Sequence, residues 1–160
     1  IPGLGPKAAY PTTGDEHDEA GNITEDAGIA AAMLEKRLRK EEVARGEMRA
    51  PFLYGPEEAD ITFVGWGSTH GAIREAVDIL NARGTSANAL HFVDLWPFPR
   101  DLTRQALANA HRLVDVEANA RAQFAYLLHA ETGIRVDQTI LKYDGRGFTP
   151  DYILGRLEVK

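Results

Sequence analysis

The sequence predicts an α/β fold with three layers, in which helices flank a mostly parallel sheet and an N-terminal loop and helix precede it. Strand-like segments alternate with helix-like segments over residues 57–160, and the connections between them are short. Hydrophobic residues make up 44% of the 160 residues, which is enough to bury one core. Strands that alternate with helices in this way form parallel sheets through right-handed crossovers.

The first strand, turn and helix span residues 61–80. Residues 61–64 include β-branched and aromatic side chains, which are typical of a buried strand, and Gly65 and Gly67 permit a tight turn. The segment that follows has an apolar face with helical spacing, formed by Ile73, Val77 and Leu80. Gly84 is expected to end this helix.

Three more strands are predicted, at residues 90–95, 113–116 and 136–143. A helix that Asp101 can cap follows the first of them. The next helix carries Phe124, Leu127 and Leu128 and ends at Gly133, and a last short helix starts at Thr149 and Pro150.

Residues 1–56 are predicted to form an appendage, and residues 57–160 the α/β domain. Within the appendage, residues 12–22 favour an irregular loop and residues 50–56 a linker. A helix is predicted between this loop and this linker, and Asn22 and Glu25 fit the capping box at its start. The chain starts at Ile1 with linker-like residues, so we expect it to be a fragment of a longer polypeptide.

Composition excludes several functions. The chain has no cysteine, so it supplies no thiolate for a disulfide or an iron–sulfur cluster. Its net charge is -6, without a basic stripe, which argues against nucleic-acid binding. It has no apolar run of membrane-spanning length and no secretory segment, so a cytoplasmic protein without membrane contact is predicted.

Residues 15–19 are the densest group of ionisable side chains: Asp15, Glu16, His17, Asp18 and Glu19. Alternate carboxylates can ligate magnesium or calcium. However, the spacing lacks the calcium-loop pattern, and adjacent side chains in a loop point apart. We therefore expect no metal here, and a solvated loop or an interface loop is favoured.

The turn at residues 65–70 approximates a dinucleotide-binding motif, with Asp94 as the acid that would bind the ribose. Its third position is His70 instead of a small residue, so a structural tight turn is favoured. Trp66, which projects from the turn, suits an interface or a buried wedge.

The ends of three predicted strands should converge on the carboxyl edge of the sheet, at residues 65–69, 94–98 and 117–119. Two interpretations stay open: a polar site, or carboxylates that cap the following helices. The polar site would contain Ser68, Asp94, Glu117 and Asn119. A contact patch for a homodimer could form nearby from Trp66, Trp96 and Phe98.

His91 and His129 lie within apolar patterns and are interpreted as structural histidines. No nucleophile, base and orienting acid can be assembled from the sequence, so no catalytic residue is assigned.

Several segments together resemble one family. They include Thr-Gly-Asp-Glu-His-Asp-Glu at residues 13–19, Val-Gly-Trp-Gly-Ser-Thr at 64–69, His-Phe-Val-Asp-Leu-Trp-Pro-Phe at 91–98, and Leu-Lys-Tyr-Asp-Gly-Arg at 141–146. The chain resembles the C-terminal portion of the alpha subunit of 2-oxoacid:ferredoxin oxidoreductases, most closely 2-oxoglutarate:ferredoxin oxidoreductase. It departs from the expected pattern at residues 117–119, where a second polar residue would lie between Glu117 and Asn119.

The resemblance implies a transketolase C-terminal-like domain of a thiamine-diphosphate enzyme, which decarboxylates a 2-oxoacid, reduces ferredoxin and transfers the acyl group to coenzyme A. It implies thiamine diphosphate, magnesium and iron–sulfur clusters for the whole complex, with none held by this fragment. The remaining domains of the alpha subunit and a beta subunit are the implied partners. This fragment would serve assembly, with residues 15–19 as a contact loop; the particular 2-oxoacid is left open.

Two alternatives belong to other functional classes. One is a stand-alone nucleotide-binding module that uses residues 65–70 and Asp94. The other is an interaction module whose acidic N-terminal segment binds a basic partner, because residues 1–60 hold thirteen acidic and seven basic side chains.

Overall fold

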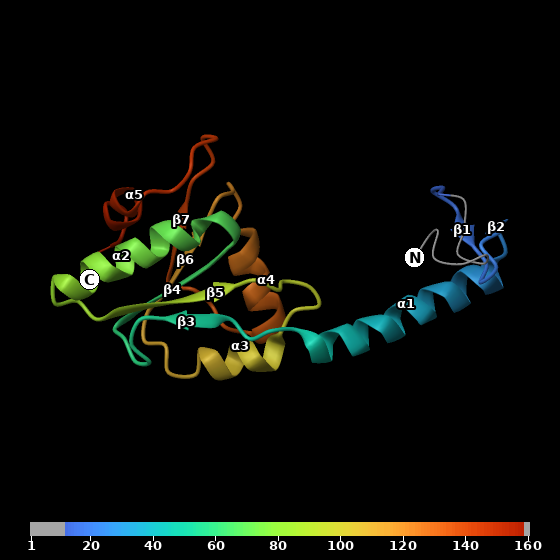
Figure 1. The fold of residues 1–160 in the computed structure, drawn as a ribbon, viewed down its shortest axis with the longest axis horizontal. Helices are drawn as coiled ribbons and strands as arrows, with labels where there is room; N and C mark the ends of the chain where they lie inside the picture. The colour runs from blue at the N-terminus through green and yellow to red at the C-terminus, as the bar shows by residue number, and fades with distance from the viewer. Residues whose placement is uncertain (1–11, 159–160) are drawn as a thin grey trace. The chain divides into compact units, whose positions relative to one another are not determined.

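The computed structural model describes residues 12–158 and separates into two compact units, Ile1–Glu47 and Met48–Lys160. The second unit is built on a five-stranded sheet with the strand order β3-β5-β4-β6-β7 (Figure 1). Its strands are β3 Phe52–Tyr54, β4 Ile61–Trp66, β5 Ala87–Phe92, β6 Leu113–Glu117 and β7 Gln138–Leu141. The neighbours β5, β4, β6 and β7 pair in parallel, and β3 runs antiparallel to β5.

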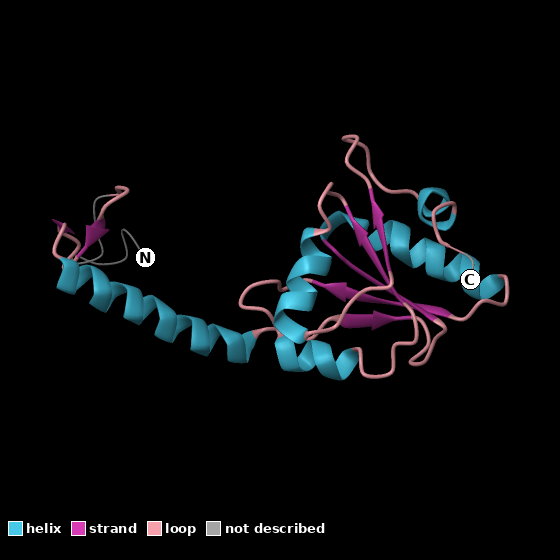
Figure 2. Ribbon diagram, turned by 180° about the vertical axis from the view of Figure 1, so that it is seen from behind, coloured by secondary structure: helices cyan, strands magenta, loops and turns pink. Residues whose placement is uncertain are grey.

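Helices cover both faces of this sheet, so the predicted α/β fold with three layers is confirmed (Figure 2). One face packs against α2 and α5, and the other against α3 and α4. Their bounds are α2 His70–Ala82, α3 Arg100–Ala106, α4 Gln123–Thr132 and α5 Pro150–Leu154. Phe63 and Val64 of β4 are both fully buried and point to opposite faces of the sheet, so each belongs to a different one of two hydrophobic clusters.

The glycine turn after β4 brings strand and helix close together. A Cβ atom added at Gly65 would lie 2.5 Å from Ile73 Cδ1 and 2.8 Å from Thr69 Oγ1. The short 3-10 helix η1, Gly67–Thr69, follows at once, and Gly67 has a φ angle of 59°. Gly65 is therefore required for packing, and Gly67 for the backbone conformation of the turn.

We expect Gly65→Ala to lower the free energy of unfolding by about 1–3 kcal/mol, because the added methyl overpacks a buried site. Urea unfolding of the two proteins measures the difference. Gly71→Ala is the matched control, since a Cβ there meets nothing within 4 Å. Equal effects of the two substitutions would contradict the packing role of Gly65.

Several predicted helix ends agree with the structure. Gly133, with a φ angle of 78°, ends α4. Thr149 Oγ1 accepts a hydrogen bond from the Tyr152 amide at 3.2 Å and caps α5, whose first residue is Pro150. The prediction for Asp101 was wrong: it lies in the first turn of α3, whose N-cap residue is Pro99.

Two segments of the second unit differ from the prediction. The strand expected at residues 90–95 spans Ala87–Phe92, because its full length pairs with β4, which outweighs the low strand propensity of its first residues. The expected linker at residues 50–56 contains β3, whose residues pair with His91, Leu90 and Ala89 of β5. Consistent with this pairing, the compact units divide after Glu47, earlier than the predicted boundary after residue 56.

The first unit holds a short hairpin and a helix. Strands β1 Glu16–His17 and β2 Ile23–Thr24 pair antiparallel, so the expected irregular loop is partly ordered. The helix α1, Ala27–Glu47, begins later than Asn22 predicted. Asp26 caps it by accepting a hydrogen bond from the Ile29 amide at 2.9 Å, so the capping box was wrong.

Within the described residues 12–158, no helix combines the length and the apolar character that crossing a membrane requires.

Candidate functional site

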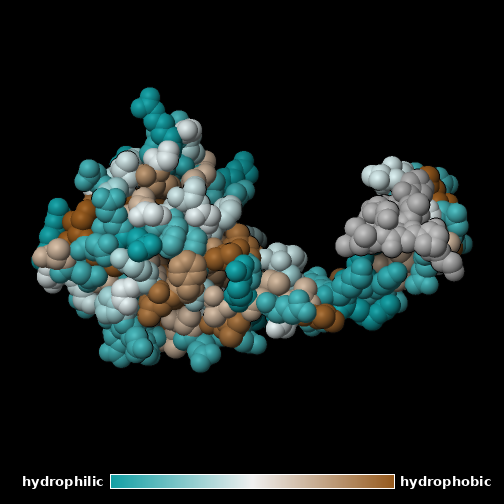
Figure 3. Space-filling view, in the orientation of Figure 1, coloured by the Kyte–Doolittle hydropathy of each residue, from teal (hydrophilic) through white to brown (hydrophobic). Residues whose placement is uncertain are grey.

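The carboxyl ends of β4, β5 and β6 meet at one edge of the sheet, as predicted. Ser68 is exposed in η1, and the tryptophans near this edge are also exposed, Trp66 by 36% and Trp96 by 63%. Val93, which follows β5, is 51% exposed. In contrast, Phe98 is fully buried, so it contributes no surface to the predicted contact patch. Apolar and polar surface alternate over the α/β unit in the space-filling view (Figure 3).

Asp94 is fully engaged by one arginine. Arg49 donates from Nη2 to Oδ1 at 2.7 Å and from Nε to Oδ2 at 2.9 Å, and its backbone amide donates to Oδ2 at 2.9 Å. These bonds lower the pKa of Asp94 to about 2. Asp94 thus links the segment before β3 to the end of β5. Because Arg49 occupies both of its carboxyl oxygens, the geometry argues against a role in ribose binding.

The turn at residues 65–70 serves packing more than ligand binding. Thr69 Oγ1 donates to the Trp66 carbonyl at 2.9 Å, and Gly65 accommodates α2. The rings of His70 and His91 are tilted by 35° with centroids 4.4 Å apart, and the Phe52 ring centroid lies 5.2 Å from each of the two imidazoles. Burial, with the nearby His70, lowers the pKa of His91 to about 4, which agrees with a structural histidine.

Glu117 and Asn119 act as a cap for the following helix. Glu117 is fully buried and accepts hydrogen bonds from the Phe124 amide at 2.8 Å, the Ala125 amide at 2.9 Å and Asn119 Nδ2 at 2.6 Å. Asn119 Oδ1 in turn accepts from the Arg121 amide at 2.9 Å. Of the two sequence interpretations, the geometry favours helix capping over a polar ligand site.

Asp115 lies two residues before Glu117 on β6 and is also fully buried. No N–H or hydroxyl group of the described residues donates to its two carboxyl oxygens, and the Glu117 carboxyl is the neighbour that can accept its proton. Burial, with the nearby Glu117, raises the pKa of Asp115 to about 9. The core of this domain therefore holds a carboxylic acid that keeps its proton at neutral pH.

The acidic residues of the first unit have separate partners. Asp18 Oδ1 accepts from the Ala20 and Asn22 amides at 2.8 and 2.9 Å, and so closes the turn between β1 and β2. Arg37 donates to Glu16 and lowers the pKa of that carboxyl to about 2. Asp15 accepts from the Thr13 hydroxyl at 3.1 Å. His17 Nδ1 lies 3.2 Å from the Asp18 carbonyl oxygen. Among residues 12–158, no three histidine, cysteine or acidic side chains are placed to hold a metal ion.

The comparisons with known proteins decide the family. Residues 59–153 match the family model described as pyruvate:ferredoxin oxidoreductase core domain II. The chain belongs to this family. The chain is also 38% identical over 150 residues to subunit alpha of 2-oxoacid:ferredoxin oxidoreductase 1 from Aeropyrum pernix, and this alignment covers 91% of the chain and 24% of that protein.

Two further relatives agree with the predicted resemblance. Subunit KorA of the 2-oxoglutarate synthase from Methanothermobacter marburgensis is 26% identical, over 98% of the chain and 42% of that protein. The solved 2-oxoglutarate:ferredoxin oxidoreductase from Magnetococcus marinus, with 2-oxoglutarate, coenzyme A and succinyl-CoA bound, matches with a TM-score of 0.76 and 31% identity. That match covers 97% of the chain and 27% of the solved chain. The chain thus spans less than half the length of these relatives.

Sequence reasoning missed two residues that shape the second unit. Arg49 was placed in the appendage, and its partnership with Asp94 joins positions 45 residues apart, which no local pattern shows. Asp115 had a visible signal, because an acid interrupts the apolar run at residues 113–116. An acid in the middle of a buried strand predicts either a partner or a raised pKa.

Proposed function

We propose that this chain is a structural and assembly part of the alpha subunit of a 2-oxoacid:ferredoxin oxidoreductase, specifically of an enzyme that acts on 2-oxoglutarate. One observation carries the assembly role: the carboxylates at the edge of the sheet are bound within the domain, whereas Trp66 and Trp96 stay exposed beside them. Tryptophan contributes strongly to protein interfaces. The edge therefore presents a contact surface in place of a reaction centre.

The activity proposed for the whole complex is oxidative decarboxylation of a 2-oxoacid to an acyl-CoA, with reduction of ferredoxin. The Magnetococcus marinus enzyme contains 2-oxoglutarate, coenzyme A and succinyl-CoA, which supports 2-oxoglutarate as the substrate. A cytoplasmic location fits an enzyme that uses these substrates.

The cofactors of such an enzyme do not fit the residues of this chain. Iron–sulfur clusters need thiolates, and the chain has no cysteine. Magnesium with thiamine diphosphate needs free oxygen ligands. However, Glu117 accepts three N–H donors, and Asp94 is occupied by Arg49. We therefore assign thiamine diphosphate, magnesium and the clusters to the remaining domains of the alpha subunit and to the beta subunit.

The proposed contact surface consists of Trp66, Val93 and Trp96, and its proposed partner is the beta subunit. The hairpin that carries Asp15, Glu16, His17 and Asp18 is a second proposed contact, since its turn is closed by internal hydrogen bonds and its shape is defined. A homodimer formed through the same edge is a further proposed arrangement, which the sedimentation measurement below also detects.

We expect Trp96→Ala in the full alpha subunit to weaken its association with the beta subunit at least about 30-fold, because loss of a central interface tryptophan costs about 2 kcal/mol or more. Sedimentation of mixed subunits over a concentration series measures this affinity. Tyr126→Ala is the matched control, since this aromatic side chain is 76% exposed on α4.

Unchanged assembly of the Trp96 variant, with intact folding, would overturn the contact surface. A calorimetric titration with ATP tests the nucleotide-binding alternative. Saturable heat that disappears in a Gly67→Val variant would support that alternative.

A further inference from the structure

The outermost parallel strand, β7, has an unpaired edge. It pairs with β6 and is last in the strand order, so no described strand lies on its other side. The Lys142 amide, directly after β7, donates to the Glu117 carbonyl of β6 at 3.1 Å. Because backbone groups point alternately to the two sides of a strand, those of Thr139 and Leu141 point away from β6. The Leu141 carbonyl agrees with this direction, since it accepts from the Tyr152 hydroxyl of α5 at 2.9 Å. An edge of this kind can accept a strand from another chain.

A groove of about 560 Å³ lies along this edge. Residues 139–144 line it, together with Ala120 from the loop after β6, Tyr152 of α5, and Arg156 from the segment that follows α5. The Tyr152 side chain both lines the groove and reaches the Leu141 carbonyl, so the groove borders the outward side of β7. A strand added to β7 would therefore occupy open space.

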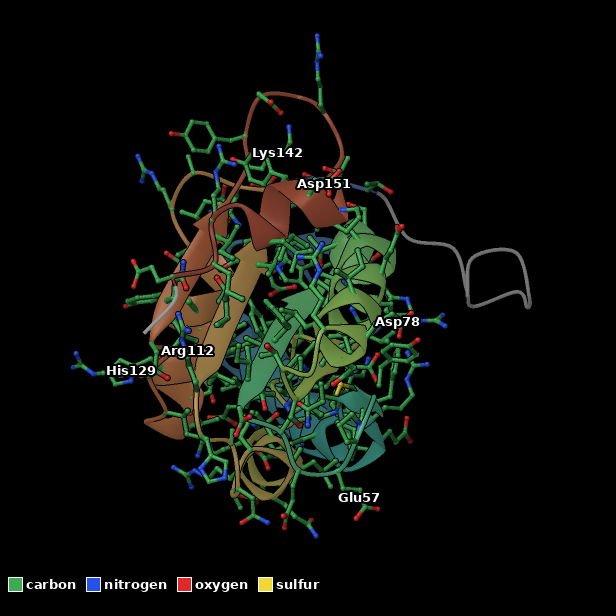
Figure 4. The ribbon with its side chains drawn as sticks, turned by 90° about the vertical axis from the view of Figure 1, so that its left-hand side faces the viewer. Glu57, Asp78, Arg112, His129, Lys142 and Asp151 are labelled. Atoms are coloured by element: carbon green, nitrogen blue, oxygen red, sulfur yellow. The ribbon has the colours of Figure 1, made fainter. Side chains whose placement is uncertain are left out.

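Two cations flank the Tyr152 ring in this groove. The guanidinium carbon of Arg156 lies 3.5 Å from the ring centroid, and Lys142 Nζ lies 5.1 Å from it. Figure 4 shows Lys142 on the side of the unit that carries α5, where Asp151 is labelled. The Lys142 side chain is nearly buried and pairs with the exposed Asp144. Within residues 12–158 the Arg156 guanidinium has no carboxylate partner. The lining thus holds two cations and one carboxylate, which favours a negatively charged occupant.

We propose that the edge of β7 binds an extended acidic segment of a partner protein, which adds to the sheet as a further strand. Its backbone would pair with the outward groups of Thr139 and Leu141, and an acidic side chain would bind Arg156. Tyr143, which is 72% exposed beside Lys142, offers an aromatic contact at the end of the groove. Pairing with a second copy of this chain is disfavoured, because it would place two basic grooves against each other. This inference is independent of the proposed enzyme activity.

A capped hexapeptide that alternates valine and glutamate is the probe that tests the proposal. Titrated into the nitrogen-15-labelled chain at low salt, it should shift the amide resonances of Thr139 and Leu141 saturably, with a dissociation constant of about 1 mM or lower. At saturation it should also slow hydrogen exchange at these two amides, because they become hydrogen-bonded. A peptide with lysine in place of glutamate should bind at least about tenfold more weakly. Equal binding of the two peptides, no saturable shift, or unchanged exchange would overturn the proposal.

A third peptide and two variants separate strand pairing from simple charge attraction. Replacing two valines of the acidic peptide with proline keeps its charge but removes backbone donors, so it should bind at least about tenfold more weakly. Arg156→Gln should weaken the acidic peptide about threefold to fivefold, as expected for an exposed ion pair. Arg146→Gln removes an exposed arginine outside the groove and should leave the affinity unchanged. Equal losses in the two variants, or full binding of the proline peptide, would show that net charge alone attracts the probe and would contradict the site.

Discussion

Replacing Glu117 with alanine is expected to lower the free energy of unfolding by about 3–5 kcal/mol. The substitution leaves the buried Phe124 amide, the half-buried Ala125 amide and the half-buried Asn119 side chain without their acceptor. It also opens a cavity where a fully buried side chain stood. Urea unfolding at pH 7 measures the loss.

Two comparisons separate capping from general damage. Glu131→Ala removes a glutamate from α4 that pairs with Arg100 near the surface, and it should cost no more than about 1 kcal/mol. Glu117→Gln keeps the shape and one acceptor oxygen and should lie between the two. Hydrogen exchange should accelerate first at the amides of residues 124 and 125. If Glu117→Ala cost no more than Glu131→Ala, the capping role would be wrong.

The layers of the α/β domain could be predicted from the sequence because the spacing of apolar residues along each element indicates which of its faces is buried. The apolar face of residues 73–80 and the buried strands at 61–64 and 113–116 appear as predicted. The edge strand β3 escaped prediction because only three residues pair, and their partner β5 is distant in sequence. The shift of β5 to Ala87–Phe92 has the same origin, since its register is set by β4.

The candidate site was predicted less completely, because residue types alone do not reveal which polar groups bind each other. The convergence of strand ends located Trp66, Asp94 and Glu117 at one edge. Whether Asp94 was free for a ligand depended on Arg49, which pattern reasoning had assigned to another segment. Similarly, only the structure shows that Glu117 is directed back toward α4.

Asp115→Asn is expected to stabilise the domain at neutral pH, by an amount on the order of a few kcal/mol near pH 8. The ordinary pKa of aspartate is 3.8, and that of Asp115 in the folded protein is raised to about 9. Between these values the unfolded chain loses the proton while the folded protein retains it, so the unfolded state binds fewer protons. The stability of the original protein therefore falls as pH rises through this window, by up to about 1.4 kcal/mol per pH unit. The asparagine variant has no proton to lose.

The decisive measurement is the difference in unfolding free energy between the variant and the original protein from pH 4 to pH 9. It should be smallest at pH 4, which lies close to the ordinary pKa of 3.8, so that the unfolded chain still holds part of this proton; it should grow with pH until it levels off above pH 9. Asp60→Asn, at an exposed carboxylate, should change the curve by no more than about 0.5 kcal/mol. A difference that is constant with pH would mean that Asp115 ionises alike in the folded and unfolded states. In that case Asp115 would be a buried charge on β6, and an ion or water would have to reach the two Asp115 carboxyl oxygens.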